Sequence, residues 1–388
     1  MHDDAPADSG STARAEDDVL DALVDRVREA RSVGGRLRIQ GGGSKAHLLA
    51  PAGPPDDGAG TIVAARHRGV VSYEPSELSL TARAGTPLAE VVSLLARHGQ
   101  ALPFEPPAFG AAATLGGTVA CGWAGPARPW RGAVRDAVLG VRLVNGLGQC
   151  LHFGGEVMKN VAGYDLARLQ AGAFGRLGML VEVSLKVLPR PACSRTRILE
   201  LDRDRALTRV VALQRGPDPV TGTAHVDGRL HVRFQGNEAA VSAAAARCGG
   251  TALDEVEAEA FWGAMREHQH GFFQGPGELW RLSLPHAAPV PDLAGNWCIE
   301  WAGAQRWLRA PAGTDLVPAV VFAAAAALGG HAVRWGPARA VPAGHAVRRA
   351  LERRLAEAFD PDGVFAPAIP ATAVAPGAAD PHPDAGST

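Results

Sequence analysis

The sequence lacks the features that mark nucleic-acid-binding, membrane-spanning and secreted proteins. Its formal net charge is −1 and it has no run of basic residues, so no nucleic-acid surface is expected. The longest apolar run, Val317 to Leu328, has 12 residues and contains Pro318, whereas a transmembrane helix needs about 20. We expect a buried helix there and no transmembrane segment. The acidic, polar N-terminus also differs from a secretory signal peptide.

Paired cysteines are missing as well. The chain has five cysteines, and none stands in a Cys-x-x-Cys pair. Neither a zinc site nor an iron–sulfur cluster is therefore expected within this chain, and we assign no metal ligand. The odd number and wide spacing are typical of reduced thiols in a cytoplasmic protein. The five are Cys121, Cys150, Cys193, Cys248 and Cys298.

Lysine is scarce: the chain has 39 basic residues, and only Lys45, Lys159 and Lys186 are lysines. Codon bias is the ordinary reason for such a ratio. Two of the three nevertheless lie in glycine-rich loops, the segments 41–45 and 154–165. Consecutive glycine amides can point into one concavity and hold an anion. We interpret that anion as the pyrophosphate of a dinucleotide, although an isolated triple glycine is more often a plain turn.

The common nucleotide-binding motifs do not match these loops. A Rossmann site needs Gly-x-Gly-x-x-Gly between a strand and a helix. Ala46 follows Lys45 where the third glycine would be required, and Leu151 stands at that place after Gly146-Leu147-Gly148. No segment matches the P-loop pattern. A third segment, Thr114 to Ala120, is rich in small residues around Gly116 and Gly117, which suits a flat ring or, equally, close packing of a helix on a sheet.

The hydrophobic pattern predicts an α+β fold in two parts. Predicted strands cover 37–40, 70–73, 78–84, 137–144, 149–153 and 181–188, and helices cover 17–32 and 87–98. A loop rich in Pro, Gly, Ala and Thr is expected from 103 to 125. After a boundary near 189–195 we expect a strand at 230–234 and helices at 238–247 and 255–267. Residues 1–16 and 371–388 are expected to be disordered.

Taken in order, these segments resemble the vanillyl-alcohol-oxidase-type flavoproteins, whose FAD-binding domain is called PCMH-type. The segments that carry this resemblance are 41–45, 77–95, 114–120, 135–140 and 172–191. Three further segments, 155–166, 272–285 and 301–308, are similar to one branch, the FAD-binding E subunits of bacterial glycolate oxidase (glycolate dehydrogenase). The resemblance spans about residues 35 to 370.

The resemblance implies a fold, a cofactor and a set of contacts. The fold is a PCMH-type FAD-binding domain of two α+β subdomains (17–191), a smaller α+β cap on the substrate side (192–355), and a C-terminal segment (356–370) that returns to the FAD domain. The cofactor is FAD, bound non-covalently because Ser44 stands where covalent members have a histidine. The implied contacts are Gly41, Gly42, Gly43, Ser44, Lys45, Thr114, Leu115, Gly116, Gly117, Thr118, Ala120, Lys159, Asn160, Gly163, Tyr164, Gly175, Gly178, Met179 and Val181.

The chain departs from the family pattern at two places. Where relatives have Gly-Ser-x-Gly-Thr-Leu-Gly, residues 172–178 read Gly-Ala-Phe-Gly-Arg-Leu-Gly, so two hydroxyl groups are missing. Where relatives have Phe-Asn-Pro-Gly-Arg, residues 365–369 read Phe-Ala-Pro-Ala-Ile. Backbone contacts with FAD could survive the first change, whereas any contact that the asparagine makes in relatives is absent here.

The resemblance also implies a function. It is the oxidation of a 2-hydroxy acid such as glycolate, with hydride transfer from the α-carbon to flavin N5. The implied partners are an iron–sulfur subunit and a larger FAD-binding catalytic subunit. The implied location of this chain is the cytoplasm, or the surface of the inner membrane if the complex associates with it. In the alternative, this chain is a structural or electron-relay subunit, because it lacks the histidine-rich metal motif of the larger subunit. The enolpyruvyl-sugar reductases, a third possibility, lack a tryptophan-rich segment like 280–307.

No catalytic residue is assigned from the sequence. An arginine could bind the substrate carboxylate and a side chain of tuned pKa could accept the hydroxyl proton. The candidates are Arg266, His268, His270 and Arg281. Paired histidines at a polar helix end are more often part of a solvated surface, and Arg281 could equally be an interface residue.

Overall fold

The structure is a computed structural model that describes residues 9–49, 58–155, 164–314, 316–336 and 346–366. Its first element is helix α1 (Ser9–Ser32), which ends where predicted but begins eight residues before Asp17. The expectation of disorder is therefore wrong for residues 9–16. Alanine has the highest helix propensity of all residues, and Ala13 and Ala15 lie in this first part.

A small sheet supports the first glycine loop. Strand β1 (Leu37–Gln40), placed as predicted, pairs in parallel with β2 (Gly60–Val63). Val24 and Val27 of α1 pack on this pair. From the other end of the chain, Phe365 forms an isolated parallel bridge to Leu37 and belongs to the same core cluster.

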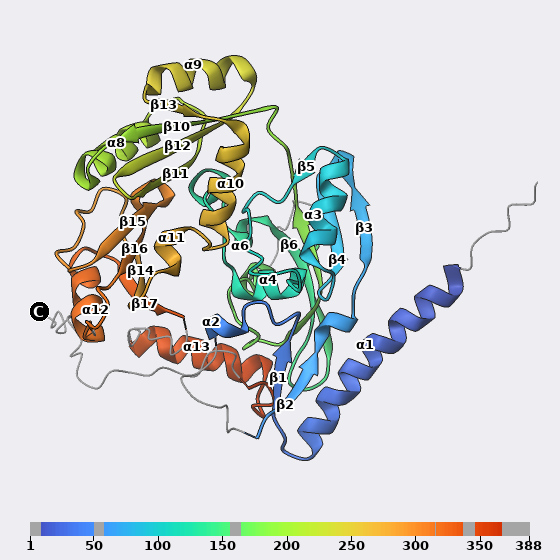
Figure 1. Cartoon of the computed structure of the whole chain (residues 1–388). Helices are drawn as coiled ribbons and strands as arrows, with labels where there is room; N and C mark the ends of the chain where they lie inside the picture. Colours follow the sequence, from blue (N-terminus) through green and yellow to red (C-terminus); the bar gives the residue numbers. More distant parts are fainter. Residues whose placement is uncertain (1–8, 50–57, 156–163, 315, 337–345, 367–388) are drawn as a thin grey trace, which may run out of the picture.

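The first large sheet has five antiparallel strands in the order β3-β4-β8-β6-β7 (Figure 1). Helix α3 (Leu88–Arg97) buries one apolar stripe against it, and a short pair forms between β5 (Gln100–Ala101) and β9 (Leu188–Pro189). These strands match the predicted ones to within two or three residues. They are β3 (Val70–Glu74), β4 (Ser79–Arg83), β6 (Val138–Val144), β7 (Cys150–Gly154) and β8 (Met179–Lys186).

The segment predicted as a loop from 103 to 125 contains helix α4 (Leu115–Cys121). Glycine, threonine and alanine do not form an amphipathic helical pattern, so no periodicity in this segment indicates a helix. The helix exists because the side chain of Thr114 caps its first turn and because Leu115 and Val119 are fully buried. Short helices flank it: α2 (Ala46–Leu49), α5 (Arg128–Arg131), α6 (Val134–Ala137) and α7 (Leu166–Leu169).

The second large sheet has eight antiparallel strands in the order β13-β10-β12-β11-β15-β16-β14-β17. If the four strands of each half are numbered 1 to 4 in chain order, both halves have the spatial order 4-1-3-2, read from the outer edge inward. The sheet is therefore built from two similar units, which join between β11 and β15. The strands are β10 (Cys193–Glu200), β11 (Val220–Val226), β12 (Arg229–Gly236), β13 (Thr251–Leu253), β14 (Leu279–Ser283), β15 (Asn296–Glu300), β16 (Gln305–Arg309) and β17 (His331–Trp335).

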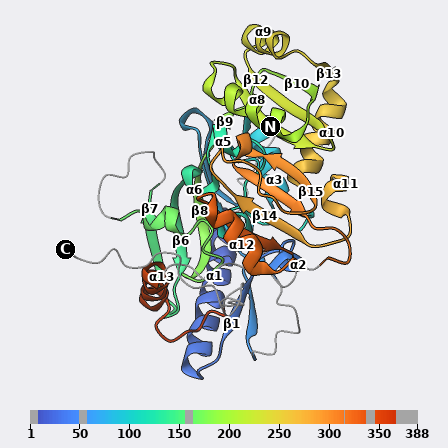
Figure 2. The ribbon, with the colours of Figure 1, turned by 90° about the vertical axis from the view of Figure 1, so that its left-hand side faces the viewer.

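Helices cover this sheet differently on its two faces. Helices α8 (Arg203–Arg215), α9 (Glu238–Cys248) and α12 (Pro318–Ala327) pack on the outer face. Helix α10 (Glu255–Arg266) and the short α11 (Gly271–Gln274) lie on the inner face, toward the first sheet (Figures 1 and 2). The run predicted as a buried helix is only half-buried: Val321 and Phe322 are enclosed, but Val317 and Val320 are 59% and 52% exposed.

The C-terminal helix α13 (Ala346–Phe359) returns to the first half of the molecule. Phe359 joins the core of the five-stranded sheet, and its carbonyl accepts a hydrogen bond from the amide of Gly146. The carboxylate of Asp360 then accepts from the amides of Val364 and Phe365 at 2.9 and 2.8 Å. These contacts hold the segment that pairs with β1.

Candidate functional site

The first glycine loop follows β1 and rests on the chain that leads into α4. A Cβ added at Gly42 would lie 1.4 Å from the carbonyl oxygen of Ala112, and one at Gly41 would lie 2.6 Å from Oγ1 of Thr114. Two of the segments singled out in the sequence are therefore direct neighbours. Both glycines are required by this close approach of one loop to the other.

The amides of this loop are available to a ligand. The described part of the chain holds no acceptor for the backbone N–H groups of Gly42, Gly43 and Ser44. Gly43 has φ +76°, which glycine adopts without strain. Successive free amides at such a turn are suited to the oxygens of a phosphate.

Lys45, predicted to add a positive charge to the loop, has a buried side chain. It is 6% exposed, and its Nζ donates a hydrogen bond of 3.4 Å to the carbonyl of Ala108. Burial lowers the pKa of its ammonium group, which the carboxylate of Glu267 partly opposes. That carboxylate also accepts from the amides of Ala108 and Phe109 at 3.0 and 2.8 Å. Lys45 thus stabilises the loop around residue 108 through this hydrogen bond to the Ala108 carbonyl.

The small residues at 114–120 form the first turns of α4, and their amides are already used. The amides of Leu115 and Gly116 donate to the carbonyls of Thr86 and Ala84, and that of Gly117 donates to Oγ1 of Thr114. A Cβ on Gly116 would lie 2.6 Å from that of Ala84. Close packing of the helix on the sheet, the alternative left open by the sequence, therefore explains Gly116.

Only part of this predicted wall can touch a ligand. Leu115 and Thr118 are 0% and 1% exposed, so their contacts are with the protein interior. Gly117 and Ala120 are half-buried and remain accessible on the surface of α4. The wall for a planar ring is thus narrower than the sequence predicted.

A further glycine-rich loop, residues 172–175, lies against the C-terminal end of α4, whereas most of the loop at 154–165 lies outside the described residues. The amides of Gly172 and Phe174 donate to the carbonyls of Val119 and Ala120 at 3.0 and 2.9 Å. A Cβ on Gly175 would lie 3.1 Å from Cδ1 of Ile39 in β1. The two glycine loops, separated by about 130 residues in the sequence, therefore flank the same helix and meet at β1.

The remaining predicted contacts separate into three groups. Met179 and Val181 are 0% and 1% exposed core residues of β8, so no ligand reaches them in this structure. Gly178 has φ +127° and is buried against Leu143, whereas the Tyr164 side chain is 93% exposed. Three others lie outside the described residues: Lys159, Asn160 and Gly163.

A narrow cavity opens between the loop around α4 and the inner face of the eight-stranded sheet. Its accessible volume is about 20 Å³, enough for one or two waters. It brings together three of the four side chains considered from the sequence, namely Arg266, His268 and Arg281. His270 is not among them, because its Nδ1 caps helix α11. The lining also includes Pro107, Phe109, Trp123, Ala124, Gly125, Pro126, Met265, Glu300, Trp301, Gln305, Trp307 and Trp335.

The strand register explains why these side chains converge. Arg281 of β14 pairs with Trp307 of β16, and Gln305 pairs with Glu300 of β15. Paired residues of antiparallel strands point to the same face, and residues two apart along a strand do as well. Arg281, Trp307 and Glu300 therefore share the inner face, whereas Trp280, Leu282 and Leu308 pack with α12 on the other face.

The cavity is electrostatically unusual. Burial raises the pKa of Glu300 to about 7, although hydrogen bonds from Trp307 and Gln305 and the charge of Arg281 act in the opposite direction. Both bonds go to Oε2, from Trp307 Nε1 at 2.7 Å and from Gln305 Nε2 at 3.1 Å. Burial and Arg281 lower the pKa of His268 to about 3, so this ring is neutral at physiological pH.

Aromatic rings fill most of the space around these groups. The His268 ring stacks on Phe273 with centroids 4.4 Å apart and meets Trp307 edge-on at 4.8 Å. The guanidinium of Arg281 lies 5.1 Å from the ring of Trp301 and 5.6 Å from that of Trp335. Such contacts stabilise a cation and exclude water from around it.

Backbone strain is concentrated at the same place. Phe109, His268 and Trp301 line the cavity with φ values of +52°, +53° and +52°. Bulky residues rarely adopt this conformation, and such strain gathers at functional sites. The strain makes the cavity a candidate for a second functional region beside the glycine loops. Glu300 was not singled out in the sequence, and Trp301 was noted only as part of the segment 301–308, because strands far apart in the chain bring them to this cavity.

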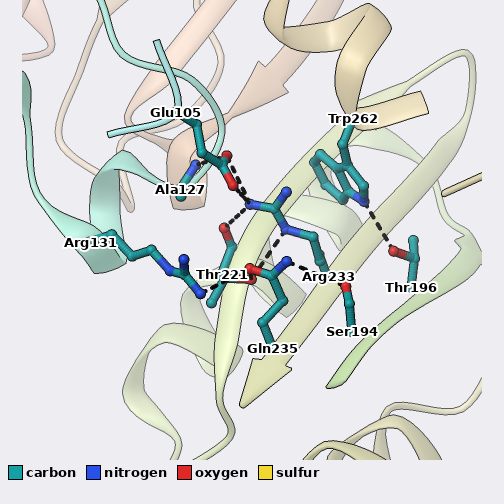
Figure 3. Close-up of polar contacts among 9 residues, drawn as sticks. All are labelled: Glu105, Ala127, Arg131, Ser194, Thr196, Thr221, Arg233, Gln235 and Trp262. Carbon is teal, nitrogen blue, oxygen red and sulfur yellow. Dashed lines mark hydrogen bonds and ion pairs between the residues drawn. The ribbon is translucent and has the colours of Figure 1, made fainter. Parts of the chain in front are cut away.

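Buried polar contacts join the two halves next to this cavity (Figure 3). Arg233 of β12 donates to the carboxylate of Glu105, and Arg131 of α5 donates to Oε1 of Gln235 at 3.1 Å. The ring of Trp262 lies 5.0 Å from the Arg233 guanidinium. These bonds fix the α4 loop against the inner face of the eight-stranded sheet.

Comparisons with known proteins give a consistent result. Residues 17–154 match the family model of an FAD binding domain. The chain is 45% identical over 352 residues to the glycolate oxidase subunit GlcE of Escherichia coli (strain K12), covering 90% of this chain and 97% of that protein. It is 30% identical over 201 residues to a D-2-hydroxyglutarate dehydrogenase of Xanthomonas citri, covering 49% of this chain and 41% of the relative.

A solved structure supports the fold. Alkyldihydroxyacetonephosphate synthase superposes with a TM-score of 0.60 at 14% identity, covering 89% of this chain and 73% of that one. The predicted fold class, an α+β PCMH-type FAD-binding fold, is confirmed. Within the described ranges, none of the helices is both long and apolar enough to cross a bilayer. The same ranges contain no cluster of three or more His, Cys, Asp or Glu side chains suited to a metal ion.

Proposed function

This chain is an FAD-dependent oxidoreductase of the glycolate oxidase subunit GlcE family, and we propose that it is the FAD-binding subunit of a complex that oxidises glycolate or a closely related 2-hydroxy acid. Bound FAD supplies the hydride acceptor for the α-carbon of the substrate. The protein supplies the binding site, the orientation of the substrate and the exclusion of water.

One observation carries the assignment of the cofactor site. The amides of Gly42, Gly43 and Ser44 have no acceptor in the described part of the chain, and they lie at the junction of β1 with α4. Three such donors fit the pyrophosphate of FAD. On the neighbouring side, the bare surface at Gly117 and Ala120 fits a flat ring, which needs contact area rather than hydrogen bonds. The residues present therefore fit the cofactor, and Ser44 leaves the binding non-covalent.

Two roles remain for the subunit within the complex. In the first, the substrate is oxidised at this flavin, in the cavity between Arg281 and the α4 loop. The strained backbone and buried charges of that cavity favour this role. In the second, the subunit relays electrons or supports the complex, while a larger flavoprotein subunit oxidises glycolate. The small accessible volume of about 20 Å³ favours the second role.

Partner subunits follow from the same proposal. The Escherichia coli relative is by name a subunit of glycolate oxidase. Electrons that reach the flavin need an onward acceptor, and the described residues hold no cluster that could serve as one. We infer an iron–sulfur subunit and a larger FAD-binding subunit as partners.

The proposal is tested with the purified chain. Its visible spectrum should show flavin bands, and anaerobic glycolate should bleach them if this flavin oxidises the substrate. Bands that bleach only after the partner subunits are added would assign the relay role. A purified, folded chain that holds no flavin and takes up none from solution would refute the proposed cofactor site.

A further inference from the structure

The cavity on the inner face of the eight-stranded sheet combines the cation of Arg281 with the carboxyl group of Glu300, whose pKa lies near neutral pH. Arg281 lies in β14 and Glu300 in β15, the two strands that flank β16, and both side chains share one face of the sheet. Glu300 is 3% exposed. Both described hydrogen bonds to its carboxylate go to Oε2, so Oε1 can carry a proton without breaking them.

We propose that this cavity binds the carboxylate of a two-carbon monocarboxylic acid between Arg281 and protonated Glu300, so that one proton enters the site with each ligand. The guanidinium attracts the ligand carboxylate, and the protonated carboxyl donates a hydrogen bond to it. Naming glycolate as such a ligand rests on the proposed function. The coupling of anion binding to proton uptake does not.

The surroundings of Glu300 leave it as the group that titrates. From β14 Arg281 faces it, from the end of α10 come Arg266 and His268, and Cys298 lies two residues before it in β15. Burial holds the pKa of the Cys298 thiol well above its usual value, so that thiol stays neutral. The ring of His268 is likewise uncharged above about pH 4. Arg128 lies farther away, across the ring of Trp301 at 4.5 Å.

A bound anion changes the proton affinity of Glu300 in a defined direction. A second negative charge in a buried site favours the neutral form of a carboxyl group. The pKa of Glu300, about 7 without ligand, therefore rises when the anion binds. A small carboxylic acid has a pKa of about 4 and stays ionised above about pH 5. Binding should weaken by about tenfold per pH unit above the pKa of Glu300.

The shape of the cavity limits the ligand. Its accessible volume is about 20 Å³ and the rings of Trp301, Trp307 and Trp335 form its walls. This volume holds the carboxylate group alone, so a two-carbon acid needs a small displacement of these rings and a larger acid a greater one, against the packing of Trp307 on Trp335 and His268. We therefore expect selection for two-carbon acids over a five-carbon dicarboxylate.

Tryptophan fluorescence of the full chain provides the test, because three indoles line the cavity. Glycolate and acetate are titrated between about pH 6 and pH 8.5, with the five-carbon dicarboxylate as the negative probe. Affinity should fall about tenfold per unit in the upper part of this range. Calorimetry in two buffers of different ionisation enthalpy should show uptake of close to one proton above the pKa of Glu300.

Two variants make the result decisive. Glu300→Gln keeps the shape and the acceptor for Trp307, so it should bind with an affinity that no longer changes with pH. Arg281→Gln should lose binding by at least tenfold at every pH. Wild-type binding that is independent of pH, absence of binding, or Glu300→Gln binding with unchanged pH dependence would each overturn the proposal.

The flavin spectrum is recorded on the same samples. A chain that holds flavin but binds acids without proton uptake would refute this inference alone. A chain that holds no flavin but binds acids with proton uptake would refute the proposed function alone. The two proposals therefore fail separately.

Discussion

Arg233 of strand β12 and Glu105 of the loop before α4 form a buried ion pair between the two halves of the molecule. The side chains are 7% and 20% exposed and their charged atoms lie 2.9 Å apart (Figure 3). Arg233 also donates to Oγ1 and to the carbonyl of Thr221, at 3.2 and 2.9 Å. Glu105 accepts from the amide of Ala127 at 3.2 Å and has φ +43°. The pair thus fixes the loop that lines the cavity.

Removing one member of this pair should destabilise the protein. Glu105→Ala leaves the Arg233 guanidinium buried without its counter-charge, which typically costs about 3–5 kcal/mol. Urea unfolding followed by circular dichroism measures the change in the free energy of unfolding. The pair Arg348–Glu352 on α13 is the control, because its side chains are 75% and 50% exposed. Glu352→Ala should change stability by less than about 1 kcal/mol, and equal losses in both variants would contradict the prediction.

The first half of the fold could be predicted because its local signals agree. Apolar and polar residues alternate along β1, which ends at a glycine loop, and α3 has one apolar stripe. The hydrophobic pattern of the sequence therefore agrees with the observed elements. Helix α4 could not be predicted, since its stability comes from a threonine cap and from burial rather than from periodicity. The duplication within the eight-stranded sheet could not be predicted either. Two units can share a strand order without sharing residues, so the repeat leaves no pattern in the sequence.

The candidate site likewise has some features that the sequence predicts and others that it does not. Glycines required by φ or by close approach, such as Gly42 and Gly43, leave a signal in the sequence whatever lies around them. The sequence offered Arg266, His268 and Arg281 only as separate candidates, because three-dimensional packing brings them together with Glu300. The charge of Lys45 could be counted from the sequence, but the burial of its side chain could not.

A single charge should separate cofactor binding from folding. Ser44→Asp puts a carboxylate beside the three free amides, where it competes with and repels a pyrophosphate, so flavin content should fall by at least tenfold. Ser44→Asn has nearly the same size without the charge and should retain flavin. The absorbance ratio of flavin to protein after purification measures this. Equal flavin content in both variants would contradict the assignment of the loop.

Two adjacent glycines should differ sharply in their tolerance of a methyl group. Gly42→Ala would place Cβ 1.4 Å from the backbone oxygen of Ala112, so the loops must separate and the protein should lose stability. Gly43→Ala meets only the flexible end of Gln40, at 3.3 Å, and its cost is the left-handed backbone, about 1–2 kcal/mol. Thermal unfolding compares them, and Gly42→Ala should have the lower Tm.

The two buried titratable groups of the cavity should act on stability in opposite directions. The pKa of Glu300 is about 7 in the folded protein and 4.5 in the unfolded chain, so its contribution to stability is full below pH 4.5 and is lost as pH rises toward 7. The pKa of His268 is about 3 in the folded protein and 6.5 in the unfolded chain, so its contribution to stability is present above pH 6.5 and is lost as pH falls. Between these unfolded-state values the two effects cancel.

Glu300→Gln removes one side of this balance. Relative to the wild type, the variant should become more stable as pH rises from about 5 to 7, by about 1.4 kcal/mol per pH unit at most. Urea unfolding of both proteins across this range measures the difference. The wild type should show the flatter profile, because proton release from unfolded Glu300 offsets proton uptake by unfolded His268. A difference between the two proteins that does not change with pH would mean that Glu300 is already ionised in the folded cavity.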